Sequence, residues 1–299
     1  MKTVLRKNFI YSFDKKSAPV MSVSTNEEVV FEVQDALGGQ IVDASSSLSA
    51  IDWNAVNPAT GPVYVCGAEP GDVLKVHIQS IEIAAQGVVM TAEGSGYYGD
   101  RIDGRHFHLV KIAGGFAEVS GLRFPLNKMI GVIGVAPAGE GCNTGTPGSH
   151  GGNMDNKTIT EGSILYLPVA TPGALFALGD LHAVMADGEV CVTGVEIAGR
   201  VTVVFEVIKD WKLPNPLQED ERRISFIGSG RTLDEAADIA LNDAYAMIRE
   251  RTGLTSADTA MFLSLCGNLE ICQIVDPLKT VRMAVAKDLL QAIGFTLPH

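Results

Sequence analysis

Short apolar runs rich in β-branched residues recur along the first 210 residues of the chain. Glycine, proline and aspartate turns separate these runs, a spacing typical of antiparallel sheets and not of alternating β–α–β units. The pattern predicts strands over 27–34, 62–66, 72–83, 106–112, 129–136, 164–169, 174–185, 189–197 and 200–208. Because the chain also holds 32 glycines in 299 residues, we expect sandwich or barrel sheets.

The pattern changes after a proline-containing connector at 212–216. Thr232 to Glu235 has the form of a capping box, and the apolar residues after it recur at intervals of three and four. This predicts an amphipathic helix from Thr232 to about Arg251 that stops at Gly253. A second helix over Ser256–Cys266, strands over 269–275 and 280–285 and a short helix near 287–293 are expected to follow. We therefore divide the chain into a β region, 1–210, that carries the functional site, and an α+β segment, 211–299, packed on the β core.

Composition and charge exclude several classes of function. The formal net charge is −12, whereas a nucleic-acid-binding protein needs a basic face that releases counterions from phosphates. The N-terminal residues lack the apolar core of a signal peptide, and no run approaches the roughly 18 apolar residues of a membrane helix. We expect a cytoplasmic protein with neither nucleic acid nor membrane as a partner. The scattered cysteines predict neither a disulfide framework nor a thiolate zinc site.

Two polar clusters suggest one shared site. The stretch Gly148-Ser-His-Gly-Gly-Asn-Met-Asp155 places His150, Asn153 and Asp155 on a glycine-rich backbone that can approach a ligand closely. About thirty residues later, Asp180 and His182 lie two apart on a predicted strand, so both side chains leave the same face. An aspartate within an apolar strand needs a partner that offsets its burial, which suits a pair of metal ligands.

A two-residue turn at Asp187-Gly188 is expected to join the strands on either side of it. In that register Glu189 shares the face of His182 but lies about four rungs away, on the order of 13 Å. Glu196 points to the opposite face. Unless a bulge shortens the path, Glu189 is not expected to contact His182 directly.

Longer motifs resemble the acetamidase/formamidase family over most of the chain. They are Asn57–Val65 (NPATGPVYV), Gly67–Leu74 (GAEPGDVL), His150–Asp155 (HGGNMD), Gly162–Val169 (GSILYLPV), Gly179–Ala183 (GDLHA) and Asp187–Glu189 (DGE). The resemblance implies a jelly-roll-like β sandwich with an accessory β barrel and a C-terminal α+β segment. It also implies a metal-bound homodimer that hydrolyses short linear amides to ammonia and a carboxylate.

The resemblance extends to Asp35, where the family usually carries an acidic residue. This chain departs from the commoner pattern at Ala36 and at Val192-Thr193, and these departures leave the choice of substrate open.

Amide hydrolysis needs an activated nucleophile, a stabilised oxyanion and a proton donor for the leaving nitrogen. A water activated by a metal ion with an open coordination position meets the first two needs, and a nearby carboxylate can move the proton. The candidate metal ligands are Asp35, Asp155, Asp180 and His182, with Zn²⁺ as the first choice of ion and Ca²⁺ as the second. The candidate catalytic residues are His150 as a ligand or proton shuttle, Asn153 as a group that polarises the carbonyl, and Glu189 as a general base.

Two alternatives remain open. The first is a cysteine nucleophile, for which Cys142 in Gly141-Cys-Asn-Thr-Gly145 is the best candidate, because a reactive thiolate must lie near a base. The second is a non-catalytic metal-binding β-sandwich module that binds a small metabolite or carbohydrate, with Asp35, Asp155 and Asp180 around Ca²⁺. Metal analysis paired with an ammonia-release assay separates these possibilities.

Overall fold

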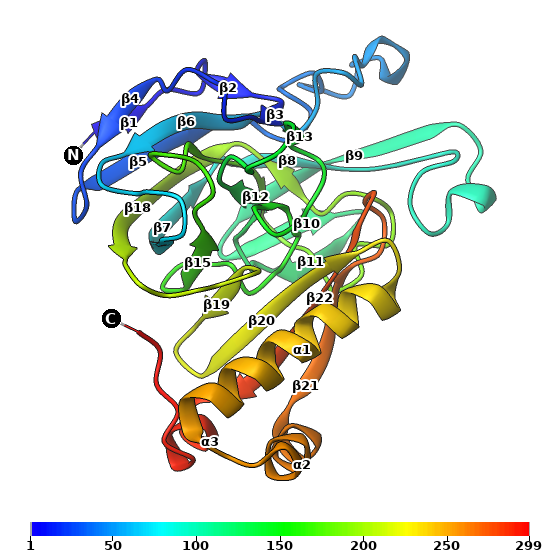
Figure 1. Cartoon of the computed structure of the whole chain (residues 1–299). Helices are drawn as coiled ribbons and strands as arrows, with labels where there is room; N and C mark the ends of the chain where they lie inside the picture. The colour runs from blue at the N-terminus through cyan, green and yellow to red at the C-terminus, as the bar shows by residue number, and fades with distance from the viewer. Residues whose placement is uncertain (1, 299) are drawn as a thin grey trace.

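The computed structural model describes residues 2–298, in which strands predominate (Figure 1). Strands hold 41% of the residues and helices 14%, which confirms the mainly β prediction. Within residues 2–298 the strands form two large sheets and one small one, and no sheet closes into a barrel. The accessory barrel implied by the resemblance is therefore absent from this part of the chain. No helix in the same residues is long and apolar enough to cross a membrane.

The first sheet begins with the N-terminal strand and ends with the C-terminal hairpin. Its spatial order is β1 (Lys2–Val4), β5 (Glu28–Val33), β18 (Gly199–Ile208), β7 (Val73–Ile83), β15 (Ile164–Pro168), β19 (Leu217–Glu219), β20 (Arg223–Gly230), β22 (Lys279–Ala286) and β21 (Asn268–Gln273). Neighbours are antiparallel except β1 and β5. In β18 the buried residues Val201, Val203 and Phe205 alternate with less buried ones, so one face of this strand lies against the core.

The second sheet carries the polar clusters. Its spatial order is β11 (Leu122–Pro125), β10 (Phe116–Val119), β9 (Arg105–Ala113), β8 (Gln86–Ala92), β17 (Glu196–Ile197), β16 (Phe176–His182), β12 (Met129–Gly134) and β14 (Gly151–Asn153). Strand β6 (Ala59–Val65) also pairs with β16, and β2 (Phe9–Ile10) and β4 (Met21–Val23) pair with β6. Strands β12 and β16 are buried along their whole length, which makes them a rigid support for side chains.

The main core fills the space between these sheets. It takes apolar side chains from both, among them Phe31, Val76, Leu165, Val203, Ile130, Phe176 and Leu178. The remaining elements are short: β3 (Ser12–Phe13) pairs with β13 (Cys142–Asn143), and 3-10 turns occur at Leu48–Ala50 and Gly99–Arg101. Burial of this apolar surface holds the two sheets together.

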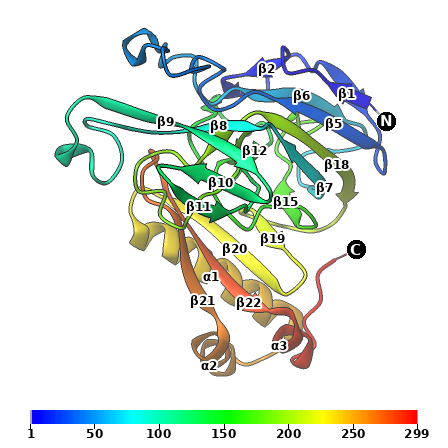
Figure 2. The same cartoon turned by 180° about the vertical axis from the view of Figure 1, so that it is seen from behind.

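The C-terminal helices agree closely with the sequence pattern. Helix α1 (Leu233–Thr252) begins after Thr232, whose side chain accepts from the N–H of Glu235, and ends at Gly253, where φ is 68°. Helices α2 (Ser256–Cys266) and α3 (Lys287–Ala292) follow. The predicted apolar face of α1 is buried against β20 and β22, which Figure 2 shows from the opposite side.

The C-terminal strands extend the first sheet. Strand β15 pairs with β19, and β20, β22 and β21 follow in order. The boundary expected at residue 210 thus falls between β18 and β19, both of which belong to this sheet.

The prediction of a continuous hairpin over 174–197 is wrong for the residues between His182 and Glu196. Strand β16 stops at His182, β17 begins only at Glu196, and the residues between them form turns. Gly188 makes a parallel bridge to Gln273, and its N–H donates to the carbonyl of Cys272 at 2.8 Å. The turn at Asp187-Gly188 is present, since the N–H of Glu189 donates to the carbonyl of Ala186 at 3.2 Å. Partners from the β21–β22 hairpin, and not two flanking strands, hold it in place.

Candidate active site

Neighbouring strands of the second sheet bring the polar clusters together. Asn153 ends β14, and Asp155 lies just beyond it. Asp180 and His182 lie on β16, and β12 pairs with both β14 and β16. Glu196 opens β17, directly opposite His182 in the ladder. Residues from distant parts of the sequence are thus placed side by side by sheet pairing alone.

One nitrogen of His182 lies among several carboxylates. Its Nε2 is 3.0 Å from Glu196 Oε1 and 3.3 Å from Asp180 Oδ1. It is also 3.8 Å from Glu189 Oε1 and 4.0 Å from Asp155 Oδ1. A single imidazole N–H cannot donate to all of these oxygens. Some of the carboxylates therefore need a proton or a cation as a further partner.

Left-handed backbone aims several of these carboxylates. The φ angles of Asp155, Asp180 and Glu189 are 41°, 55° and 46°, a region that non-glycine residues seldom adopt. At Asp180 this conformation interrupts an otherwise extended strand. Backbone strain of this kind concentrates at functional sites, where the surrounding structure holds it in place.

Glycines leave the space that the cluster occupies. A Cβ on Gly131 of β12 would lie 2.4 Å from Asp155 Oδ1 and 2.6 Å from Asp180 Oδ2. A Cβ on Gly194 would lie 2.8 Å from the His182 ring. Any larger residue at Gly131 or Gly194 would overlap the side chains of Asp155, Asp180 or His182, so both positions require glycine.

Most residues of the cluster line a pocket of about 280 Å³. Its polar lining is Asn153, Asp180, His182, Thr193, Glu189, Glu196 and Asp276, with Asn57 and Ser95. Its apolar lining includes Leu37, Trp53, Val56, Met90 and Val192. A wider groove of about 1060 Å³, which includes Lys157, Arg222 and Arg223, has none of the predicted site residues in its lining. We therefore place the candidate active site in the smaller pocket.

Burial and mutual repulsion raise the pKa of most of these carboxyl groups. Burial, reinforced by neighbouring carboxylates, raises the pKa of Asp155, Glu189, Glu196 and Asp276 well above the usual values. Burial also acts on Asp180, but the charge of His182 outweighs it and lowers the pKa of this carboxyl. Burial opposes the charged form of His182 as well, but Glu196 and Asp180 raise its pKa well above the usual value. A cation bound among these carboxyl groups would lower their pKa again, because it favours the charged form.

The residues fit a bound divalent cation. Asp155, Asp180 and His182 each offer a ligand atom within 4.8 Å of the others, as do His182, Glu189 and Glu196. Buried polar atoms without a hydrogen-bond partner include Asp155 Oδ1, Asp180 Oδ1 and Glu196 Oε2. Unpaired buried carboxylate oxygens are costly unless a cation or proton satisfies them. Oxygen and nitrogen donors of this kind suit zinc and other divalent ions.

The family follows from comparison with known proteins. A model of the Acetamidase/Formamidase family matches residues 12–140 and 138–276. The chain belongs to the acetamidase/formamidase family. Members of this family are hydrolases that act on the C–N bonds of amides.

Individual relatives agree with the family assignment. The crystal structure of a predicted acetamidase/formamidase from Thermoanaerobacter tengcongensis is 43% identical, covers 99% of each chain and has a TM-score of 0.97. The formamidase of Methylophilus methylotrophus is 26% identical over 300 residues, which is 77% of this chain and 74% of that protein. A formamidase-related protein of Schizosaccharomyces pombe is 28% identical over 252 residues, 63% of this chain. This match spans only 61% of the length of the S. pombe protein.

Three of the predicted site residues, Asp35, His150 and Asp155, are not among the residues that line the pocket. Asp155 still reaches the cluster, with its Oδ1 4.0 Å from His182 Nε2. The His150 ring packs edge-on against Phe13, with ring centroids 5.3 Å apart, and burial lowers its pKa to about 4. Asp35 Oδ1 accepts from the backbone N–H groups of Leu37 and Gly39. Burial raises the pKa of Asp35, and the charge of Asp180 adds to this effect. Their roles as metal ligands, or as a shuttle for His150, stay predictions.

The environment of Cys142 does not favour a thiolate. Its Sγ lies 3.8 Å from the carbonyl oxygen of Thr146, and burial raises the pKa of the thiol. It is not among the residues that line the pocket. A nucleophilic cysteine needs the opposite shift and a base beside it.

Glu189 and Glu196 correct the strand geometry expected from the sequence. Glu189 was expected about four rungs from His182 and Glu196 on the opposite face, yet both carboxylates lie within 4 Å of His182 Nε2. Glu189 lines the pocket from a residue with left-handed backbone, and Glu196 reaches His182 as its ladder partner. An acidic residue inside the apolar run Gly194-Val-Glu-Ile-Ala198 is the same signal that marked Asp180.

Asp276 is the site residue with no signal in the sequence. It lies in the turn between β21 and β22, and its Oδ2 accepts from Nδ2 of Asn153 at 2.9 Å. An Asp-Pro pair between two predicted strands resembles any turn. Only the fold brings this hairpin over the second sheet.

Proposed function

We propose that this protein hydrolyses short linear amides of the formamide and acetamide type to ammonia and a carboxylate. The observation that carries the proposal is the buried cluster of carboxylates around His182, most of which line a small pocket. Such a cluster is costly to bury and adds nothing to the apolar core around it. Family membership supplies the class of reaction, and the pocket supplies a place for it.

We propose that Asp155, Asp180 and His182 hold a divalent cation, Zn²⁺ as the first choice and Ca²⁺ as the second. Their donor atoms converge, and Asp155 Oδ1 and Asp180 Oδ1 have no hydrogen-bond partner. A bound divalent cation supplies Lewis acidity, which makes water a stronger acid and polarises a carbonyl group. The left-handed backbone at both aspartates sets the direction of these side chains.

The other polar residues of the pocket handle the proton and orient the amide. Burial and neighbouring charges raise the pKa of Glu189, which makes this carboxylate a stronger base than an exposed one. It takes the proton from the attacking water and delivers it to the leaving nitrogen. Asn153 Nδ2 donates to Asp276 Oδ2, which leaves its second N–H to polarise the substrate carbonyl. The apolar side chains around the pocket limit the access of bulk water.

The test is ammonia release from formamide and acetamide. Asp180→Asn and His182→Ala should each lower turnover at least about 100-fold, since a metal ligand or its alignment is lost. Glu206→Gln is the matched control, because Glu206 lies on β18 outside the pocket and pairs with Lys75 of β7. Near wild-type rates in Asp180→Asn with the metal retained would rule out the role of Asp180. Metal in the wild-type protein without turnover of any short amide would favour the binding module instead.

Two expectations that came with the resemblance stay predictions. We propose that the protein is a homodimer and that it works in the cytoplasm. Light scattering on the purified protein should give twice the monomer mass, and a monomer would contradict the first. Cell fractionation tests the second.

A further inference from the structure

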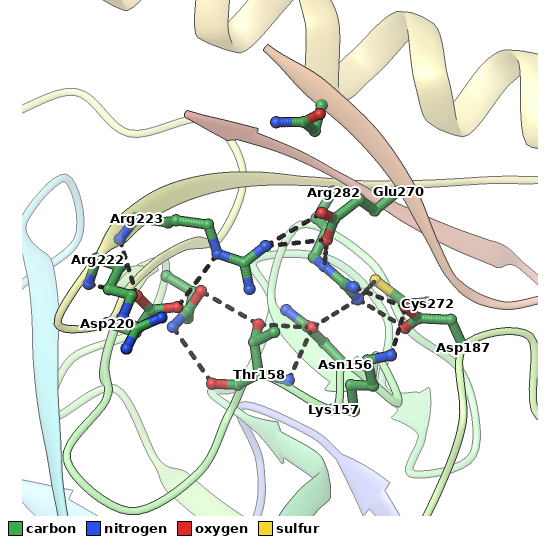
Figure 3. Close-up of polar contacts among 12 residues, drawn as sticks. Asn156, Lys157, Thr158, Asp187, Asp220, Arg222, Arg223, Glu270, Cys272 and Arg282 are labelled. Carbon is green, nitrogen blue, oxygen red and sulfur yellow. Dashed lines mark hydrogen bonds and ion pairs between the residues drawn. The ribbon is translucent and has the colours of Figure 1, made fainter. Parts of the chain in front are cut away.

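Arg282 is a buried arginine in the middle of an apolar strand. It is 1% exposed and lies on β22 between Val281 and Met283. Its Nε donates to Glu270 Oε2 at 2.6 Å, and its Nη1 and Nη2 donate to the two Asp187 oxygens at 2.9 Å each (Figure 3). Buried ion pairs seldom stabilise a fold more than apolar residues of similar volume would. Stability alone therefore gives little reason for a charge at this position.

The contacts of Arg282 lead to segments that carry the candidate site. Asp187 is two residues before Glu189, and Asn156, which accepts from Arg282 Nη1 at 3.1 Å, is next to Asp155. Figure 3 shows Asp187 and Asn156 converging on the guanidinium from separate segments of the chain. One side chain thus connects to both the loop of Glu189 and the loop of Asp155.

The strand hairpin that carries Arg282 also holds these segments through its backbone. The N–H of Gly188 donates to the carbonyl of Cys272, and the N–H of Ile274 donates to the carbonyl of Gly188. Gln273 Oε1 accepts from the N–H of Asp276 at 3.0 Å. The hairpin that carries Arg282 is therefore hydrogen-bonded to the residue before Glu189 and to Asp276. Glu189 and Asp276 both line the pocket.

The geometry of Glu189 needs such support. Its φ of 46° is left-handed, and a conformation of this kind persists only where the surroundings fix it. Residues 183–195 form no regular strand, and backbone hydrogen bonds hold the segment at separate points, such as Ala183 to Val195 and Gly188 to Cys272. The two-pronged pair between Asp187 and Arg282 is the strongest kind of side-chain contact available to hold that turn.

We propose that Arg282 is a positioning residue, whose two-pronged pair with Asp187 fixes the turn that aims Glu189 at the amide. Glu270 has a different part. It pairs with Arg282 from β21 and with Arg223 Nη1 at 3.1 Å, so it balances charge within the sheet and touches no segment of the pocket. This proposal rests on the proposed amide hydrolysis.

Asp187→Asn and Glu270→Gln form a matched pair of variants. Each removes one carboxylate charge from the same guanidinium with almost no change in shape. We expect Asp187→Asn to lower kcat on acetamide at least about tenfold with KM changed less than about twofold, as a displaced catalytic group would. Glu270→Gln should keep kcat within about twofold, although both variants lower Tm. Equal kcat in both, or losses that follow Tm alone, overturn the proposal.

Lys157→Met tests whether Lys157, the second cation that pairs with Asp187, is the residue that positions the turn. Lys157 Nζ pairs with Asp187 Oδ2 at 2.7 Å, and this variant should keep kcat within about twofold if Arg282 is the partner that matters. A tenfold loss in Lys157→Met overturns the assignment to Arg282. Arg282→Lys is the further variant if Asp187→Asn does not fold. It keeps the charge and loses the two-pronged geometry, so kcat should fall at least about fivefold, and an unchanged kcat overturns the proposal.

Hydrogen exchange separates the positioning role from the reaction itself. The amides of Gly188, Glu189 and Val192 are hydrogen-bonded within or from this turn, so a released turn exchanges them faster. Exchange over residues 183–195 should be at least about tenfold faster in Asp187→Asn than in Glu270→Gln. This result supports the positioning role even if the wild-type protein releases no ammonia from short amides. Absence of ammonia release would refute the proposed function and leave the positioning role standing. Equal exchange in the two variants overturns the positioning role.

Discussion

Single residues in this protein adopt conformations that their own preferences oppose. Asp155, Asp180 and Glu189 have left-handed backbone, which costs on the order of 1–3 kcal/mol at each non-glycine residue. Each of these residues contributes a carboxylate near His182. Local propensity could not predict these angles, because contacts from other strands impose them. The spacing of Asp180 and His182 did predict that the two side chains lie together, although Asp180 departs from the extended backbone on which that prediction rested.

Gly131 should be essential to the site although it carries no chemistry. In Gly131→Ala the new methyl group would lie within 2.6 Å of both Asp155 Oδ1 and Asp180 Oδ2, so one carboxylate must move. Displacement of about 1 Å is enough to reduce catalysis strongly, and we expect kcat for ammonia release to fall at least about tenfold.

The matched control is Gly139→Ala. No atom lies within 4 Å of the Cβ that this substitution adds, so turnover and Tm should stay at wild-type values. Full activity in Gly131→Ala would mean that the two aspartate side chains are not held as described.

His150 should make the folded state sensitive to acid. Burial lowers its pKa to about 4 in the folded protein, against about 6.5 in an unfolded chain. Between these values the unfolded state binds the proton and the folded state does not. The stability is thus complete above pH 6.5 and is lost progressively as the pH falls to 4, by about 3 kcal/mol.

Urea unfolding at a series of pH values measures this loss. The free energy of unfolding of His150→Gln should decline less between pH 7 and pH 4 than that of the wild type. Curves that run parallel through this range would show that His150 is not the group responsible.

At the scale of elements, local signals succeeded and long-range partners did not. The capping box at Thr232 and the glycine at 253 predicted where α1 begins and ends. The observed helix, Leu233–Thr252, begins and ends beside these two residues. The turn at Asp187-Gly188 also looked local, but Gly188 pairs with Gln273 and Asp187 with Arg282. A sequence pattern cannot reveal a partner on a distant strand, so the segment 183–195 was predicted wrongly.

Helix α1 should contribute to stability and not to catalysis. Its residues pack on β20 and β22 and do not line the pocket. Thr232→Ala removes the side-chain oxygen that accepts from Glu235, and should lower the free energy of unfolding by about 1 kcal/mol. Chemical denaturation gives that value, and Thr232→Ser should restore it. A fall in kcat at unchanged stability would contradict this division of roles.

For the whole molecule, the mainly β class could be predicted because strand patterns and turn residues repeat along the chain. The continuous first sheet could not, since β19 reaches β15 across the connector at 212–216. Asp276 enters the site for the same reason, because the β21–β22 hairpin ends beside Asn153. The site therefore depends on the C-terminal segment as well as on the β region that carries most of it.

The central claim is that a divalent cation on Asp155, Asp180 and His182 makes this protein an amide hydrolase. The most direct measurement is ammonia release from acetamide by protein stripped with a chelator, before and after Zn²⁺ is restored, with metal content followed by mass spectrometry. Stripping should lower turnover at least about 100-fold. Added Zn²⁺ should restore the wild type but not His182→Ala. Wild-type turnover in protein shown to be free of metal would contradict the account.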